Sequence, residues 1–101
     1  MNRPIDSRKE FFEVLEQTRT EAEARFQRAP RSALYESIAR QLDAMQSMTA
    51  SGRTPTEDER ESITIGLLAA RELEPAQDLD LADFIERLHE LNGYFTAWPP
   101  N

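Results

Sequence analysis

The chain has 101 residues, a net charge of −7 and no cysteine. A chain of this length is expected to form one domain that buries roughly 60–65% of its unfolded surface, too little for a deep enclosed pocket besides a core. The acidic balance disfavours nucleic acid and anionic membranes as partners, because both require Lys and Arg to meet phosphates. Without cysteine, disulfides, thiol catalysis and thiolate metal sites are excluded.

No stretch approaches the ~20 apolar residues that span a bilayer, and residues 1–6 lack the apolar core of a signal peptide. We therefore expect a soluble cytoplasmic protein. The charge is unevenly distributed: eight acids balance eight bases up to Ala50, whereas eleven acids face four arginines from Ser51 onward. An asymmetry of this kind between the two halves of a chain indicates an interaction surface.

The first predicted helix begins at Ser7, where Ser7-x-x-Glu10 forms a capping box, and ends before Pro30. Apolar residues recur along it at steps of three and four, which is typical of an amphipathic helix. A second helix with the same pattern is expected over residues 32–49. Gly52 follows it and is predicted to take the left-handed conformation that often ends a helix.

The third predicted helix has the strongest start signal in the sequence. Thr54-Pro55-Thr56-Glu57 puts threonine at the N-cap, proline at the first helical position and glutamate at N3. The helix is expected to continue through the apolar run Ile63–Ala70 and to stop before Pro75. Gly66 lies inside this run, where glycine costs ~1 kcal/mol relative to alanine. We therefore expect Gly66 to permit close approach of a neighbouring helix.

The fourth predicted helix begins near Asp78 or Asp80. Asn92-Gly93 either caps it or precedes a last turn, and Pro99-Pro100 prevents further helix. Short loops between successive helices favour antiparallel neighbours. The sequence thus predicts an all-α fold, a small antiparallel four-helix bundle, with a short fifth helix or a turn at the C-terminus. The predicted domain is residues 1–101, of which 1–6 and 96–101 are flexible or tail segments.

The candidates for metal binding and catalysis are weak. Glu86-x-x-His89 has the spacing of half a di-iron carboxylate site, but His89 is the only histidine and a second such motif is required. Asp78-x-Asp80-x-x-Asp83 lacks the glycine and terminal glutamate of a calcium loop, and acids here complement the helix dipole instead. With no nucleophile beside a base and no Gly-rich phosphate loop, we expect no enzyme, no metal and no cofactor.

Several acids of the second half break the local rules of helix stability. Glu57 and Glu61, and likewise Glu86 and Glu90, are like-charge pairs at i,i+4 spacing. Two further acids lie near a helix C-terminus, which the dipole disfavours. Broken local rules are expected at functional sites. Trp98 either folds back on the core or anchors a partner. The predicted partner-binding residues are Glu72, Glu74, Asp83, Glu86, Glu90, Tyr94 and Trp98.

Four short runs carry a family resemblance over residues 52–95. They are Gly52-Arg53-Thr54-Pro55-Thr56-Glu57-x-Glu59-Arg60, Ile63-x-x-Gly66-x-x-Ala69-Ala70-Arg71-Glu72-Leu73-Glu74, Asp80-Leu81-Ala82, and Leu91 to Phe95. These runs resemble the small helical immunity proteins of type VI secretion that neutralise NAD(P)-degrading glycohydrolase toxins. Earlier in the chain, Tyr35-x-x-Ile38-x-x-Gln41-Leu42 is similar to the second helix of that family.

The resemblance implies a non-enzymatic protein that binds a cognate toxin domain, obstructs its active site and protects the producing cell. A cleft that binds a dinucleotide is expected to be basic, so an acidic surface would complement it and speed association. Two alternatives remain open: an acidic helical secretion chaperone or adaptor that shields a client, and a self-associating structural bundle. The chaperone hypothesis predicts an obligate dimer with a large apolar surface, whereas the immunity hypothesis predicts a tight one-to-one complex.

Overall fold

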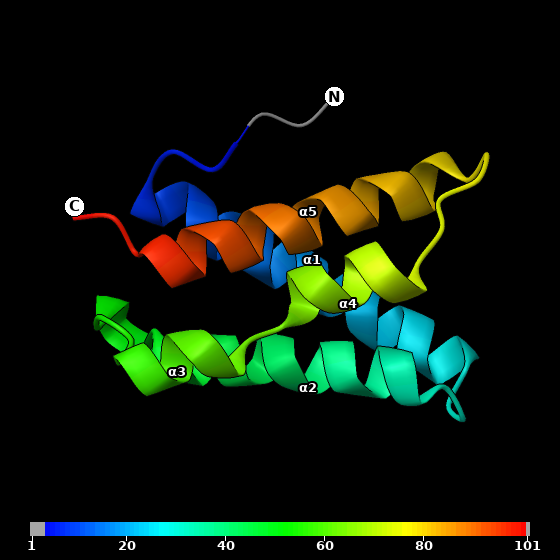
Figure 1. Cartoon of the computed structure of the whole chain (residues 1–101), viewed down its shortest axis with the longest axis horizontal. Helices are drawn as coiled ribbons and strands as arrows, with labels where there is room; N and C mark the ends of the chain where they lie inside the picture. Colours follow the sequence, from blue (N-terminus) through cyan, green and yellow to red (C-terminus); the bar gives the residue numbers. More distant parts are fainter. Residues whose placement is uncertain (1–3, 101) are drawn as a thin grey trace.

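The computed structural model describes residues 4–100 and is helical, which confirms the predicted all-α class. The elements are α1 (Arg8–Arg28), α2 (Ala33–Met48), a 3₁₀ turn (Ala50–Gly52), α3 (Glu57–Ser62), α4 (Ile65–Glu72) and α5 (Leu79–Ala97). The chain reverses direction after α1, after α2 and after α4 (Figure 1). Because α1 contacts α2 and α5, while α4 contacts α5 and α2, these four helices enclose one core.

The single long third helix of the sequence prediction is wrong: α3 and α4 take its place. Thr56 rather than Thr54 is the N-cap of α3. The Thr56 side chain accepts a hydrogen bond from the Glu59 N–H, and the Glu59 carboxylate accepts one from the Thr56 N–H at 2.9 Å. The sequence offers two overlapping Thr-x-x-Glu patterns, and the structure uses the second.

The break between α3 and α4 is held by a residue of α2. Ile63 takes an extended backbone (φ −92°, ψ 121°), so it and Ile65 are both buried. The Gln41 side chain accepts a hydrogen bond from the Thr64 N–H at 2.6 Å and donates one to the Thr64 hydroxyl at 3.1 Å. Gln41 therefore replaces the helical partner that this N–H loses at the break.

At the end of α5, the sequence Asn92-Gly93 lies inside the helix and does not cap it. The Asn92 side chain accepts a hydrogen bond from the Gly66 N–H of α4 at 2.8 Å. α5 continues to Ala97 and ends at Trp98, which adopts a left-handed backbone (φ 34°). No further helix follows in residues 98–100. Of the segments predicted to be flexible, residues 1–3 and 101 lie outside the described range.

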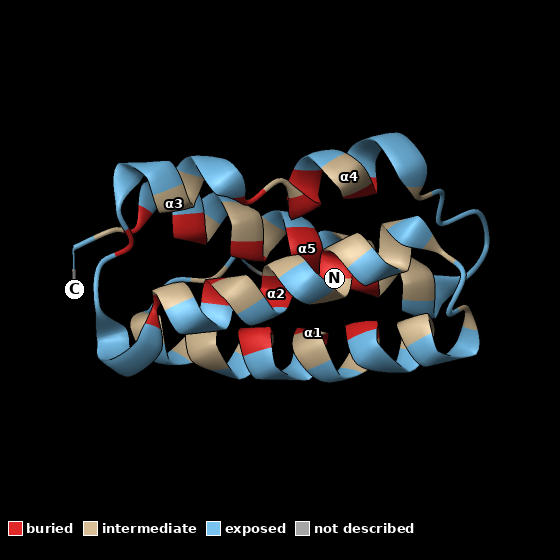
Figure 2. Cartoon of the chain, turned by 90° about the horizontal axis from the view of Figure 1, so that it is seen from below, coloured by how far each residue is buried: buried red, intermediate tan, exposed pale blue. Residues whose placement is uncertain are grey.

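The other helix ends agree with the sequence prediction, apart from two details: one at the start of α1 and one after the end of α2. Ser7 caps α1 as expected, but the Glu10 carboxylate accepts from the N–H of Asp6 instead of Ser7, so the capping box is incomplete. Gly52 is left-handed (φ 77°) as predicted, but a 3₁₀ turn separates it from the end of α2. Figure 2 shows the buried residues of the four packed helices turned toward the shared core.

Candidate partner-binding surface

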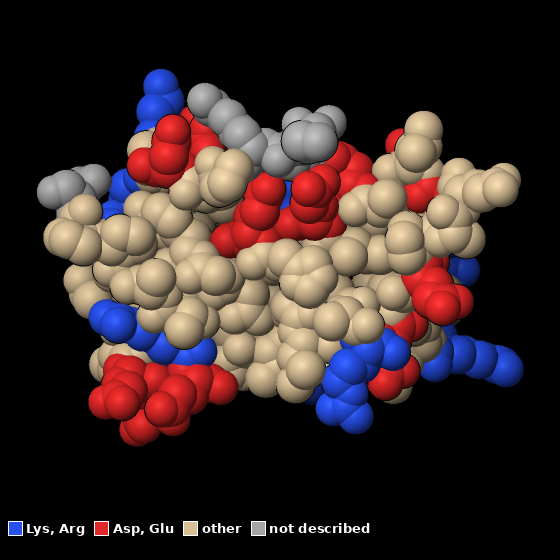
Figure 3. Space-filling view, turned by 45° about the horizontal axis from the view of Figure 1, so that its top comes forward, with Lys and Arg blue, Asp and Glu red and all other residues tan. Residues whose placement is uncertain are grey.

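Three of the predicted partner-binding acids share one side of α5. Asp83, Glu86 and Glu90 recur at steps of three and four, which places them on neighbouring turns of the same helix side. Glu90 is half-buried, and burial raises its pKa above the ordinary value. The carboxylates of Glu86, of Glu10 on α1 and of Asp83 raise this pKa further. Figure 3 shows acidic side chains gathered at its upper centre, over α5.

Arg87, the only arginine or lysine on α5, is directed toward α1, although it also reaches Asp83 of the acidic row. It is buried, and its guanidinium forms an ion pair with Glu21, which also accepts a hydrogen bond from Arg25 at 2.9 Å. Arg87 lies 3.8 Å from Asp83 at its Nε. Its closest interaction is therefore the cross-link to α1. Within residues 4–100, Glu86 and Glu90 form no ion pair.

Glu72 and Glu74 lie apart from the α5 row, although the sequence prediction grouped them with it. Glu72 is the last residue of α4, and Glu74 belongs to the loop that leads to α5. Both are exposed, and neither forms an ion pair with another described residue. The structure thus divides the predicted acidic face into a row on α5 and a separate pair at the end of α4.

The two predicted aromatic anchors, Tyr94 and Trp98, pack against the start of α1. Phe11 stacks on Tyr94 with ring centroids 5.2 Å apart and meets the edge of Trp98 at 5.3 Å. The Arg8 guanidinium lies 4.0 Å from the Trp98 centroid and donates a 2.9 Å hydrogen bond to the Pro99 carbonyl. Trp98 is only 5% exposed. It folds back on the core, so it offers a partner almost no surface.

Arg8 makes a tertiary contact that the sequence prediction missed. The signal was present, because a positive charge at the first helical position opposes the helix dipole. The cost is offset by the Trp98 ring and the Pro99 carbonyl, which together hold the C-terminal segment against α1. At Arg8, a local rule of helix stability is therefore broken in favour of a tertiary contact.

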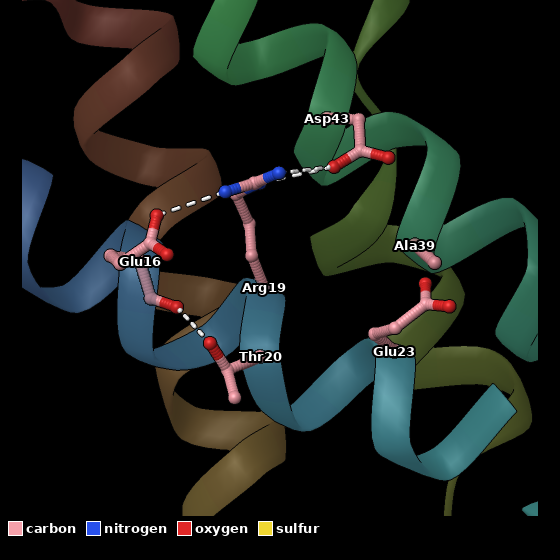
Figure 4. Close-up of a pocket in the computed structure, with 6 residues that line it drawn as sticks. All are labelled: Glu16, Arg19, Thr20, Glu23, Ala39 and Asp43. Atoms are coloured by element: carbon pink, nitrogen blue, oxygen red, sulfur yellow. Dashed lines mark hydrogen bonds and ion pairs between the residues drawn. The ribbon is translucent and has the colours of Figure 1, made fainter. Parts of the chain in front are cut away.

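Among the described residues of the first half of the chain, by contrast, four acids form ion pairs with arginines: Glu16, Glu21, Glu36 and Asp43. Figure 4 shows Arg19 in an open hollow between α1 and α2, reaching Glu16 on its own helix and Asp43 on α2. Both nitrogen–oxygen distances are 2.9 Å. The arrangement links the two helices through one arginine. The unbalanced charge of the molecule is therefore concentrated on α3, α4 and α5.

Two structural findings concern other classes of function. In the part of the chain that the structure describes, no group of three or more His, Cys, Asp or Glu residues is arranged to hold a metal ion. None of the described helices has the length and apolar character needed to cross a bilayer.

The family comparison covers nearly the whole helical unit. The sequence matches the model of the Tsi6 family over residues 10–96, from the first turns of α1 to the last turn of α5. The chain belongs to the Tsi6 family. Tsi6 is a family of type VI secretion immunity proteins, so membership indicates a toxin partner. No curated protein and no solved structure matches the chain at a significant level.

Proposed function

We propose that this protein neutralises an NAD(P)-degrading glycohydrolase toxin by binding its catalytic domain and covering the active site in the cytoplasm of the producing cell. Membership of the Tsi6 family over residues 10–96 carries the proposal. The resemblance of residues 52–95 to immunity proteins against such toxins supports the choice of toxin. Inhibition of this kind requires no chemistry from the inhibitor, only a surface that excludes the substrate.

The negative charge of the second half of the chain supports the view that the toxin binds an acidic surface of this protein. A cleft that binds the phosphates of a dinucleotide is rich in donors and positive charge. We propose that the toxin contacts Glu72, Glu74, Asp83, Glu86 and Glu90. Tyr94 is half-exposed and lies beside the acidic row, while Trp98 supports the same helix end from beneath. Complementary charge would mainly speed association and select the partner.

The exposed apolar surface favours this function over a secretion chaperone. A chaperone that shields a client is expected to present a large apolar surface when empty. Among residues 4–100, only two large hydrophobic side chains are strongly exposed, Leu67 at 53% and Leu79 at 83%. They lie on different helices, α4 and α5. This limited exposure fits a small, polar-rimmed interface better than a client-binding groove.

The proposal is tested with the purified toxin domain of the cognate effector and NAD⁺ or NADP⁺ as substrate. Increasing amounts of the protein should reduce hydrolysis to zero at one equivalent, and co-expression should restore growth of cells that produce the toxin. Binding that leaves hydrolysis unchanged would support an adaptor role instead. If the effector consumes neither dinucleotide, the toxin class in the proposal is wrong even though an immunity role stands.

A further inference from the structure

An uncharged strip runs along the outer surface where α4 meets α5. On α5, Ile85, His89 and Gly93 are spaced by four residues, so they follow one another on the same side of the helix. Thr96 continues this line by one further turn. His89, Gly93 and Thr96 are exposed and Ile85 is half-buried. Figure 3 shows a broad band without charged atoms across this face, with acidic groups above it and both basic and acidic groups below it.

α4 supplies the other side of the strip. The hydrogen bond from the Gly66 N–H to Asn92 fixes the first turn of α4 against α5. Leu67 follows Gly66 and is 53% exposed, and Ala70 lies one turn further along α4 and is also exposed. An exposed leucine loses the ~1.5–3 kcal/mol that full burial would contribute. The strip therefore has an apolar side chain at its edge that gains from a partner.

Two sets of carboxylates flank the strip, one on α5 itself and one on α3. Glu86 and Glu90 border it on the side of α1. At the other end, an open hollow of about 480 Å³ is lined by Thr96 together with Glu57, Arg60 and Glu61 of α3. Glu57 and Glu61 form no ion pair with any described residue. Ten residues of α5 separate Glu86 from Thr96, which corresponds to about 15 Å along the helix.

We propose that this strip is the docking face for the toxin, and that its occupant is a toxin segment with apolar or small side chains flanked by two Lys or Arg positions about 15 Å apart. The inference rests on the proposed function and specifies which face of this chain the toxin meets. The apolar side chains would cover Leu67 and lie across Gly93. One basic group would enter the hollow beside Glu57 and Glu61, and the other would meet Glu86 and Glu90.

Charge repulsion disfavours a second copy of this chain as the occupant. Two strips packed face to face would bring the four flanking carboxylates of one copy close to those of another, each copy carrying a net charge of −7. Like charges across an interface oppose association. The raised pKa of Glu90 agrees with this reasoning, because burial and the nearby carboxylates already disfavour its negative charge in the isolated protein. A basic partner would relieve the repulsion.

Two substitutions test the strip with a matched control. L67Q removes the exposed apolar side chain of the strip, and L79Q makes the same change at the other strongly exposed leucine, outside it. G93Q places a side chain on the floor of the strip, where no atom lies within 4 Å of the position that a Cβ would take, so folding is not obstructed. The affinity of each variant for the purified toxin domain is measured by calorimetry, with folding followed by circular dichroism.

We expect L67Q and G93Q each to weaken binding by about tenfold or more, as at the centre of an interface, and L79Q to change it by less than about twofold. If the unaltered protein binds and inhibits but L67Q and G93Q bind equally well, the strip is not the docking face. If L79Q alone weakens binding, the toxin meets the start of α5. Failure of the unaltered protein to bind the toxin overturns the proposed function itself.

Discussion

A substitution at Gly66 tests how closely α4 packs on α5. A Cβ atom there would lie 3.2 Å from Asn92 Oδ1 and 3.3 Å from Asn92 Cβ, so the neighbour would have to move. We predict that Gly66→Leu lowers the free energy of unfolding by about 1–3 kcal/mol through overpacking. Denaturant titration measures the change.

The control for this prediction is the other helical glycine, Gly93. Nothing lies within 4 Å of its added Cβ, so Gly93→Ala should raise the free energy of unfolding by about 0.5–1 kcal/mol, the usual gain inside a helix. An unchanged midpoint for Gly66→Leu would mean that α4 and α5 are not in close contact there.

Trp98 gives a second prediction at this scale. Its ring packs against Phe11, Tyr94 and Phe95 and is covered by the Arg8 guanidinium. Trp98→Ala should therefore cost about 3–5 kcal/mol of stability, as expected for a buried aromatic residue. Thermal unfolding provides the measurement. Tyr94→Phe removes only a hydroxyl whose contact with Arg8 is long, 3.4 Å, and should change stability little. A Trp98→Ala variant as stable as the parent would mean that the C-terminal segment is detached in solution.

Glu59 links a helix cap to pH. The Arg53 guanidinium, followed by the Thr56 N–H, lowers the pKa of Glu59 from 4.5 to about 2. Because the folded-state pKa is below the unfolded value, this stabilising contribution is complete above pH 4.5 and is lost as the pH falls toward 2. We predict that Arg53→Gln moves the NMR titration midpoint of the Glu59 carboxyl back up toward 4.5. A midpoint unaffected by Arg53→Gln would show that the cap alone sets this pKa.

At the scale of secondary-structure elements, capping residues in the sequence correctly predicted those helix starts that are determined by hydrogen bonds between near neighbours in the chain. Ser7, Ser32 and Asp78 each cap a helix by accepting an N–H three residues ahead, and the sequence placed all three helix starts to within about two residues. The division between α3 and α4 could not be predicted in this way. It depends on Gln41, which is 23 residues away in sequence and bonds Thr64 across the core.

The same distinction applies to the candidate surface. Spacing alone predicted that Asp83, Glu86 and Glu90 share a side of α5, because the helical repeat fixes that relation. It could not decide whether Trp98 faces inward, since that depends on Arg8 and Phe11 at the opposite end of the chain. The features that the sequence pattern did not predict depend mostly on contacts between residues far apart in sequence.

The contact between α1 and α5 supplies a prediction for a pair of elements. Glu21 of α1 accepts from Arg25 and from the buried Arg87 of α5. Glu21→Ala would leave the Arg87 guanidinium without its main partner, which should lower stability by about 1–3 kcal/mol. Glu13→Ala, an exposed change on the same helix, should stay within about 0.5 kcal/mol. Equal effects of the two changes in urea titrations would show that the ion pair contributes nothing to the packing of α1 on α5.

At the scale of the whole molecule, ion pairs between described residues are more frequent in the first half of the chain and unpaired acids in the second half. Acids of α1 and α2 such as Glu16, Glu21 and Asp43 are bound by arginines, whereas those of α3 to α5 mostly face solvent. The first half of the chain is neutral overall, so the negative electrostatic field that a distant partner meets comes from the second half. Such a field steers association and is screened by salt. The position of the charge, rather than its total, should therefore decide how fast the toxin binds.

Two double charge-reversal variants with the same net charge distinguish the effect of where the charge lies from the effect of the total charge. Glu86→Lys with Glu90→Lys alters the acidic row of α5, and Glu13→Lys with Glu23→Lys alters exposed positions of α1. We predict that only the α5 pair slows association with the toxin domain strongly, by about tenfold at low salt, with a smaller loss at about 0.15 M salt, where the Debye length is about 8 Å. Protection in co-expressing cells should weaken in parallel, while circular dichroism remains unchanged. Equal slowing by both pairs would mean that net charge alone steers the toxin. No slowing by either would make the acidic row ordinary solvated surface.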